Sequence, residues 1–169
     1  MIKQTMLAVI LSCTGLFGIN TPITSAEAII EAKSGSAISG KVTFKQEPSG
    51  VRIVADVKGL KPGLHGFHIH EKGDCSAADA SSAGGHYNPH NKPHGGPNSP
   101  ERHVGDFGNL VANGAGEAHY DEISDLVELN GEYSIIGKSV VIHADPDDLK
   151  TQPTGNSGVR IGCGEIKAK

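Results

Sequence analysis

Short runs in which apolar and polar residues alternate, separated by turn-forming residues, recur along this chain and limit the folds that it can adopt. In residues 51–57, for example, every second position is Val, Ile or Ala. Side chains two residues apart point to the same face of a strand, so such a run can bury one face and expose the other. Similar runs lie at residues 37–44, 133–136, 139–143 and 159–166. Because no stretch shows a sustained apolar stripe of helical period, the sequence predicts an antiparallel β-sandwich or β-barrel.

Seven candidate metal ligands stand out against this background. His68 and His70 are one residue apart, so in a strand both can face one ion while Ile69 enters the opposite layer. The other candidates are His86, His94, His103, Asp106 and His143. Imidazole suits Zn, Cu, Fe and Ni, and three histidines with one carboxylate and no thiolate fit a closed tetrahedral zinc site. If one imidazole uses both ring nitrogens, the seven residues give two ions four ligands each, which favours a bridged pair of metals.

Residues 84–106 carry several of these ligands, and their composition predicts a long loop. The histidines at positions 86, 90 and 94 are spaced by four, as on one face of a helix, but the segment also contains four prolines and five glycines. An interior proline costs a helix about 3 kcal/mol, so a helix is rejected. A loop of this length in a small domain is usually functional or disordered, and bound metal is a natural way to order it.

Residues 1–26 are predicted to be a signal peptide, and residues 27–169 the folded domain. Lys3 precedes a largely apolar run, and Thr24-Ser25-Ala26 offers a small-residue cleavage site. Two alternatives stay open. The run could be a retained membrane helix, although it is short for one, or Cys13 could be lipidated and tether the product to a membrane surface. Each version predicts export, to a periplasm or the extracellular space, or as a lipid-anchored envelope protein.

The predicted domain is acidic. Removing residues 1–26 takes away one lysine and no acid, so the formal charge changes from −4 to −5. This charge argues against a nucleic-acid partner. The remaining 143 residues suffice for one domain, and the scarcity of aromatic residues predicts a core built mainly from Val, Ile, Leu and Ala.

The exported domain would keep two cysteines, Cys75 and Cys163. An even pair in a secreted protein predicts a disulfide. The alternative is two unrelated thiols. A bond would pin a loop close to the histidine strand to a strand near the end of the chain.

From about Ile38 to Ile166 the chain resembles the secreted copper/zinc superoxide dismutases. The motifs that carry this resemblance are Gly66-Phe67-His68-Ile69-His70-Glu71, Gly85-His86-Tyr87-Asn88-Pro89, His94-Gly95-Gly96-Pro97, Arg102-His103-Val104-Gly105-Asp106, Val141-Ile142-His143 and Gly155-Asn156-Ser157-Gly158-Val159-Arg160 with Cys163-Gly164. The resemblance implies an all-β fold, an eight-stranded antiparallel Greek-key barrel with long metal-binding and active-site loops. It also implies a disulfide between Cys75 and Cys163.

The activity implied by the resemblance is the disproportionation of superoxide to oxygen and hydrogen peroxide, in antioxidant defence. A histidine-bound copper would be reduced and reoxidised in turn, beside a structural zinc, with one ion of each metal per subunit. The copper ligands would be His68, His70, His86 and His143, and the zinc ligands His86, His94, His103 and Asp106.

Three residues receive further roles from the resemblance. His86 would bridge the metals and return a proton to the developing peroxide, and Arg160 would dock the anion beside copper. Asp147 would accept hydrogen bonds from the remote nitrogens of His68 and His94 and so fix both tautomers.

The chain also departs from the better-known eukaryotic pattern. Cys75 follows His70 by only five residues, and the stretch from Asp147 to Arg160 is short, which puts the usual substrate-guiding charges in doubt. Lys150 is the candidate for that task. Monomer and homodimer both stay open.

His65, His90 and His119 match no ligand position and are expected to be solvated or capping. The alternative function is a non-enzymatic copper/zinc carrier or buffering domain. Arg160 argues against it, because a carrier needs no anion dock, and residues 27–169 contain no Met to serve as a soft ligand for Cu(I). A zinc hydrolase would need an open zinc position, which three histidines with Asp106 do not leave.

Overall fold

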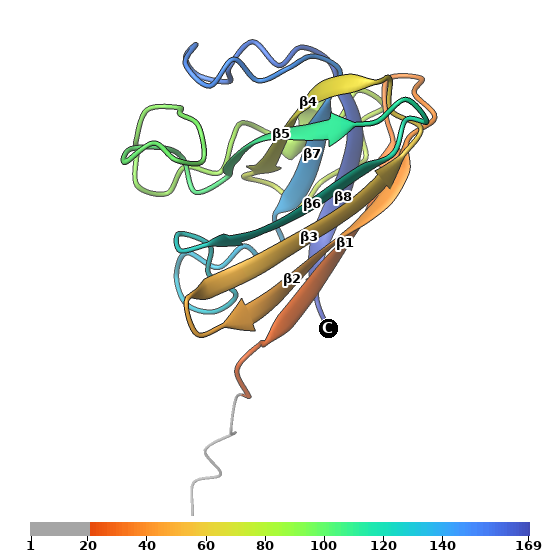
Figure 1. Ribbon diagram of the computed structural model, residues 1–169. Coiled ribbons are helices and arrows are strands. Elements are labelled where there is room, and N and C mark those ends of the chain that lie inside the picture. Colours follow the sequence, from red (N-terminus) through yellow and green to blue (C-terminus); the bar gives the residue numbers. More distant parts are fainter. Residues whose placement is uncertain (1–20) are drawn as a thin grey trace, which may run out of the picture.

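The alternating runs become strands of one closed barrel in the computed structural model, which describes residues 21–169 (Figure 1). The strands are β1 (Ser25–Ala32), β2 (Ser39–Glu47), β3 (Gly50–Lys58), β4 (Gly63–His70), β5 (Asp106–Ala112), β6 (Ala118–Ser124), β7 (Ser139–His143) and β8 (Arg160–Ala168). A 3₁₀ turn, η1 (Ser81–Ala83), is the one helical element among these residues. Every neighbouring pair is antiparallel, and the order around the barrel is β1-β2-β3-β6-β5-β4-β7-β8. The predicted eight-stranded antiparallel Greek-key barrel is confirmed.

The barrel closes around the apolar faces of the strands. In β3, Val51, Ile53, Ala55 and Val57 are buried, while the intervening Arg52 and Asp56 are exposed. The largest fully buried side chains include Phe44, Phe67, Ile53, Ile69, Leu110, Leu129, Ile135, Ile142 and Ile166. The core is therefore aliphatic with few aromatic residues, as the composition predicts.

One predicted strand is wrong. Residues 133–136 form a loop that touches residue 128 through a single isolated bridge. Ile135 is buried in the core, and its N–H donates to the carbonyl of Glu128 at 2.9 Å. The apolar residues of this run thus cover part of the core without joining the sheet, because glycines at positions 131 and 137, both with positive φ, turn the chain on either side.

The predicted signal peptide and Cys13 lie mostly or wholly outside the described residues. Within the described part, Ser25 and Ala26 are the first residues of β1, and Ala26 is buried opposite Phe44. No helix within residues 21–169 is both long and apolar enough to cross a membrane.

Strand order brings the candidate site residues together. β4, which carries His68 and His70, lies between β5 and β7, and His68 pairs with Asp106 of β5. On the far side of β7, His143 pairs with Arg160 of β8. Phe67 and Ile69 point into the core, so His68 and His70 occupy the outer face of the barrel wall. Two loops, residues 71–105 and 144–159, cover this face.

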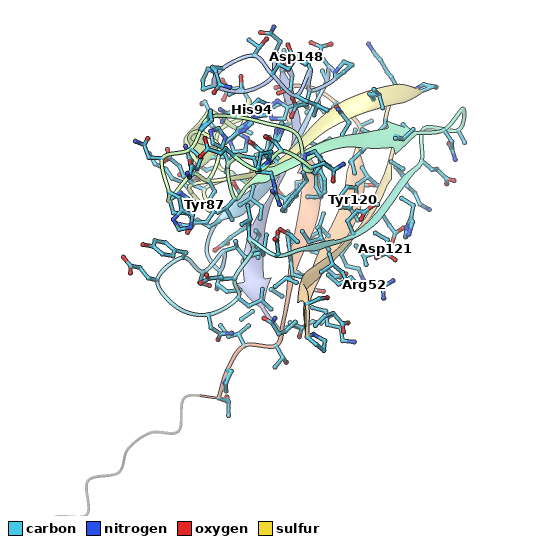
Figure 2. The ribbon with its side chains drawn as sticks, turned by 60° about the vertical axis from the view of Figure 1, so that its left-hand side comes forward. Arg52, Tyr87, His94, Tyr120, Asp121 and Asp148 are labelled. Carbon is cyan, nitrogen blue, oxygen red and sulfur yellow. A yellow bond between two sulfur atoms is a disulfide. The ribbon has the colours of Figure 1, made fainter. Side chains whose placement is uncertain are left out.

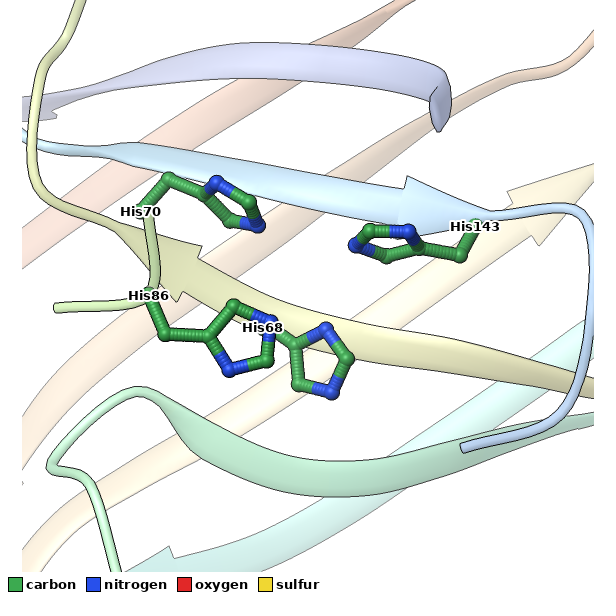
Figure 3. Close-up of side chains that lie close together, drawn as sticks. All are labelled: His68, His70, His86 and His143. Atoms are coloured by element: carbon green, nitrogen blue, oxygen red, sulfur yellow. The ribbon is translucent and has the colours of Figure 1, made fainter. Parts of the chain in front are cut away.

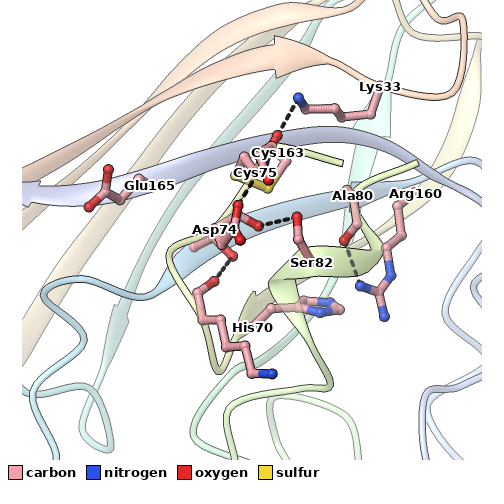
Figure 4. The surroundings of a disulfide bond; sticks show 12 residues. Lys33, His70, Asp74, Cys75, Ala80, Ser82, Arg160, Cys163 and Glu165 are labelled. Carbon is pink, nitrogen blue, oxygen red and sulfur yellow. Dashed lines mark hydrogen bonds between the residues drawn. A yellow bond between two sulfur atoms is a disulfide. The ribbon is translucent and has the colours of Figure 1, made fainter. Parts of the chain in front are cut away.

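The predicted disulfide between Cys75 and Cys163 is present (Figure 4). It ties the loop that follows β4 to strand β8 across 88 residues of sequence. Lys33, just past β1, adds a hydrogen bond from Nζ to the carbonyl oxygen of Cys75 at 2.5 Å. The chain between β4 and His86 is therefore held to the barrel by the disulfide and by the hydrogen bond from Lys33.

Replacing both cysteines, as Cys75→Ser with Cys163→Ala, should destabilise the metal-free protein by about 4 to 5 kcal/mol, because the unfolded chain gains the freedom of a long loop. Urea unfolding of the metal-stripped variant and wild type measures this difference. A variant whose midpoint matches that of the oxidised wild type would contradict it, and the reduced wild type serves as the matched control.

Candidate metal centre

Four histidines converge between β4, β7 and the loop that follows β4. They are His68, His70, His86 and His143, and Figure 3 shows their rings facing one another. Each has one buried ring nitrogen without a hydrogen-bond partner: Nδ1 of His68 and Nε2 of His70, His86 and His143. Buried polar atoms are rarely left unpaired, and four donors this close together fit a cation that accepts their lone pairs.

The opposite nitrogen of three of these rings faces an oxygen that can only accept. His68 Nε2 lies 2.8 Å from Asp147 Oδ2, His70 Nδ1 lies 2.9 Å from the Gly84 carbonyl, and His143 Nδ1 lies 3.2 Å from the Gly158 carbonyl. These nitrogens must therefore carry the hydrogen and donate it. The tautomer is fixed in each ring, and the inward nitrogen keeps its lone pair for a metal.

A second group lies beside the first and consists of His86, His94, His103 and Asp106. His86 Nδ1 and His103 Nδ1 are 3.4 Å apart, and they lie 2.9 Å and 3.2 Å from Asp106 Oδ1. His94 Nδ1 lies 3.0 Å from the other oxygen of Asp106. Four ligands placed tetrahedrally about 2 Å from one ion are roughly 3.3 Å from each other, so these spacings fit zinc.

His86 belongs to both groups. Its Nε2 is the unpaired atom of the first group, and its Nδ1 contacts the carboxylate of the second. One ring thus presents a different nitrogen to each cluster. Seven candidate residues can give two metals four ligands each only if one ring serves both, and His86 is placed to be that ring.

Asp147 connects the two groups from behind. Its Oδ2 accepts from His68 Nε2, and its Oδ1 accepts from His94 Nε2 at 2.9 Å. Asn109 of β5 holds the Asp147 backbone on both sides, donating from Nδ2 to its carbonyl at 2.9 Å and accepting from its N–H at 2.7 Å. A Cβ at Gly155 would overlap Asp147 Oδ1, so a glycine is needed where the loop passes the carboxylate.

The chain bends locally where its histidines turn toward the site. The register of β4 against β5 shifts between Gly66 and His68, and that of β7 against β8 shifts between Ile142 and His143. Bulges of this kind redirect side chains. A Cβ at Gly66 would lie 2.6 Å from the Ser157 Cβ, so this glycine lets the second covering loop approach the strand.

Sequence reasoning missed the side chains that hold the loops. Gln152 accepts from the His94 N–H at 2.7 Å and donates to the His94 carbonyl at 2.9 Å. Asp148, on the same side of the molecule as His94 in Figure 2, caps the turn that contains Lys150 and Thr151. Lys150 itself is exposed in this turn.

The three remaining histidines behave differently from one another. His65, expected to be solvated or capping, is buried, with Nδ1 2.8 Å from the His143 carbonyl and Nε2 2.8 Å from the Lys61 carbonyl. It ties the turn before β4 to the end of β7. His119 is exposed beside Asp56, and His90 packs against the Tyr133 ring.

Arg160 lies at the edge of the first histidine group. Its Nη1 donates to the carbonyl oxygen of Ala80 at 2.8 Å (Figure 4). The side chain is partly buried, and its positive charge reaches both His70 and His143. A small anion beside these rings would therefore meet a fixed cation.

Burial sets the proton affinity of the first group. Loss of solvent lowers the pKa of His86 to about 4 and that of His143 to about 3, and it lowers the pKa values of His68 and His70 as well. The like charge of neighbouring groups, including Arg160 for His70 and His143, acts in the same direction. These rings are therefore neutral at pH 7, and each keeps a lone pair that a metal can accept.

His94 behaves in the opposite way. Burial opposes its charge, but the carboxylates of Asp106 and Asp147 raise the pKa of His94 to about 9. Burial also disfavours the Asp106 carboxylate, yet hydrogen bonds from His103, His86 and His94 hold the pKa of Asp106 far below its usual range. Without a metal, the second group therefore keeps a proton on His94 at neutral pH.

Comparison with known proteins follows the same motifs. A family model described as copper/zinc superoxide dismutase matches residues 38–166. An extracellular superoxide dismutase [Cu-Zn] from Brugia pahangi is 44% identical over 155 residues, covering 86% of this chain and 77% of that protein. A superoxide dismutase [Cu-Zn] from Onchocerca volvulus is 44% identical over 154 residues, covering 85% and 95% respectively.

Among solved structures, the crystal structure of the clock protein EA4 superposes with a TM-score of 0.82 at 40% sequence identity. The match covers 90% of this chain and 98% of that one.

Zinc binding to metal-stripped protein at pH 7.5 should release about one proton, because the raised pKa of His94 keeps this ring protonated until zinc displaces the proton. Zinc affinity should therefore rise about tenfold per pH unit between pH 7.5 and 8.5 and level off above pH 9. Calorimetry in buffers of different ionisation enthalpy counts the protons. Asp147→Asn removes one of the two carboxylates and should reduce the release, whereas a pH-independent affinity in the wild type would refute the assignment.

Proposed function

We propose how this chain performs the reaction of the copper/zinc superoxide dismutases, the family to which it belongs. It is an oxidoreductase that disproportionates superoxide to oxygen and hydrogen peroxide, with copper and zinc as its cofactors. The observation that carries the residue assignment is the single ring of His86, which offers Nε2 to one cluster and Nδ1 to the other.

Copper would be held by Nδ1 of His68 and by Nε2 of His70, His86 and His143, since these are the buried unpaired nitrogens of the first group. Zinc would be held by Nδ1 of His86, His94 and His103 together with Asp106. Four protein ligands close a tetrahedral site, so zinc would order the covering loop rather than bind substrate.

The chemistry that copper supplies when bound is the transfer of one electron from one superoxide to a second. The second superoxide must also gain two protons to leave as hydrogen peroxide. His86 Nε2 would hold one of them when this ring is not a copper ligand, and solvent would supply the other. An imidazole suits this task because it can take up and release a proton near neutral pH.

Arg160 would position the anion. Its guanidinium stands beside the first histidine group, is fixed by the Ala80 carbonyl, and presents planar N–H donors. A permanent positive charge at this point attracts a small anion to the acidic protein and raises the rate of encounter.

We further propose export of the chain, by cleavage after Ala26 or, alternatively, by lipid attachment at Cys13. The support is the basic and apolar start of the sequence, the Cys75–Cys163 disulfide, and the extracellular naming of the relative from Brugia pahangi. Cleavage after Ala26 would leave most of β1 within the product.

His143→Ala should reduce dismutase activity to that of the metal-free protein while zinc stays bound in a one-to-one ratio. The reason is that His143 belongs to the first group alone, so all four proposed zinc ligands persist. Activity assays and elemental analysis of the purified variant measure both properties. His119→Ala, which removes an exposed histidine that belongs to neither group, should keep both metals and full activity. Loss of zinc from His143→Ala would argue against the proposed division of ligands.

Expression of the full chain in a Gram-negative bacterium should give a soluble product that begins at Glu27, as measured by intact mass and N-terminal sequencing. Cys13→Ser should leave this result unchanged. A product that incorporates labelled palmitate, and loses the label in Cys13→Ser, would replace cleavage after Ala26 with lipid anchoring.

A further inference from the structure

One carboxylate stands close to the proposed anion dock. Asp79 directly precedes Ala80, whose carbonyl oxygen accepts the hydrogen bond from Arg160 Nη1. Asp79 is exposed, and its Oδ1 accepts from the Ser81 N–H at 3.0 Å, so the turn into η1 holds this carboxylate in place. The negative group is thus fixed one residue away from the carbonyl on which the guanidinium rests.

The two charges act on each other without forming an ion pair. Hydrogen bonds from Ser81 are the main cause of a lowered pKa at Asp79, and the charge on Arg160 lowers it further. In return, burial lowers the pKa of Arg160 while Asp79 opposes that change. Within residues 21–169, no carboxylate makes a salt bridge to Arg160. The N–H donors of Arg160 that do not bond to Ala80 therefore stay available to an incoming anion, but the field of the guanidinium is weakened.

We propose that Asp79 is a specificity-determining residue that weakens anion binding at Arg160 and rejects multiply charged anions more strongly than superoxide. The inference rests on the proposed role of Arg160. Coulomb energy is proportional to the product of the charges, so a dianion such as hydrogen phosphate feels twice the repulsion of a singly charged anion. Asp79 thus lowers the encounter rate for superoxide slightly and protects the dock from phosphate to a greater extent.

The same loop contains a matched control. Asp74 is also exposed, and its Oδ1 accepts from the Ser76 N–H at 2.8 Å, the same two-residue turn that Asp79 makes with Ser81. The charged neighbour that acts on Asp74 is Lys72 rather than Arg160. Figure 4 shows Asp74 on the disulfide side of the loop, apart from Arg160. Asparagine can preserve the turn at either position and removes one negative charge in each case.

The experiment compares Asp79→Asn, Asp74→Asn and Asp79→Glu in the copper- and zinc-loaded enzyme. At an ionic strength of about 10 mM, Asp79→Asn should raise kcat/KM for superoxide about twofold, and the gain should fade as salt approaches about 0.5 M. Asp74→Asn should change the rate less than Asp79→Asn does. Asp79→Glu keeps the charge and should match the wild type.

A second measurement does not depend on turnover. Inorganic phosphate is titrated into zinc-loaded, copper-free protein, and the Arg160 Nε–Hε signal is followed by NMR. Asp79→Asn should tighten phosphate binding about fourfold, the square of the effect on a single charge. Equal rates and phosphate affinities for Asp79→Asn and Asp74→Asn would overturn the inference, as would an equal change in Asp79→Glu, which would mark a structural effect.

Arg160→Met separates this inference from the role of Arg160 itself. The variant should lower kcat/KM and weaken phosphate binding, with phosphate affinity followed by competition against azide at the copper visible band in the loaded enzyme. If it does so while Asp79→Asn behaves like Asp74→Asn, only the inference about Asp79 fails. If Arg160→Met changes neither property, the proposed dock fails and the inference fails with it.

Discussion

A single buried carboxylate, Asp147, connects the two candidate metal-binding groups. By accepting N–H groups from Nε2 of His68 and Nε2 of His94, it holds the hydrogen on that nitrogen and leaves Nδ1 of each ring as the atom that faces a metal. A buried carboxylate is costly unless it is hydrogen-bonded, and the two histidine N–H groups together with the Leu149 backbone N–H meet that need. Asn109 meanwhile holds the Asp147 backbone. The position of this one group therefore fixes the loop at residues 144–159, the tautomers and the distance between the clusters together.

The barrel supplies the rigidity that such a site needs. In β4 the same alternation that sends Phe67 and Ile69 into the core sends His68 and His70 outward. The histidines are therefore mounted on the wall of a packed hydrophobic core rather than within it. Two irregular loops then bury them, and these loops are ordered by polar contacts such as that of Gln152 with His94.

The candidate ligands, which the structure brings together in two groups, could be predicted from the sequence because metal coordination needs particular residue types at particular spacings. The residues that hold the ligands could not. Asn109 and Gln152 lie 38 and 58 residues from their partners, and a single amide carries no local pattern. The strand predicted at residues 133–136 is wrong because Ile135 enters the core from a loop. The sequence also did not indicate that His65 would be buried between two backbone carbonyls. Alternating runs alone predicted β2, β3, β7 and β8.

Strand β8 carries Arg160 and Cys163 three residues apart, while the opposite cysteine and Ala80 share one short loop. The disulfide and the hydrogen bond from Arg160 to the Ala80 carbonyl therefore connect the same loop to the same strand. Thiol reductants would break the disulfide. The loop that carries Ala80 would then be held by the hydrogen bond from Lys33 and by backbone hydrogen bonds. If Arg160 docks the anion as proposed, the placement of this cation is coupled to the oxidising power of the surroundings.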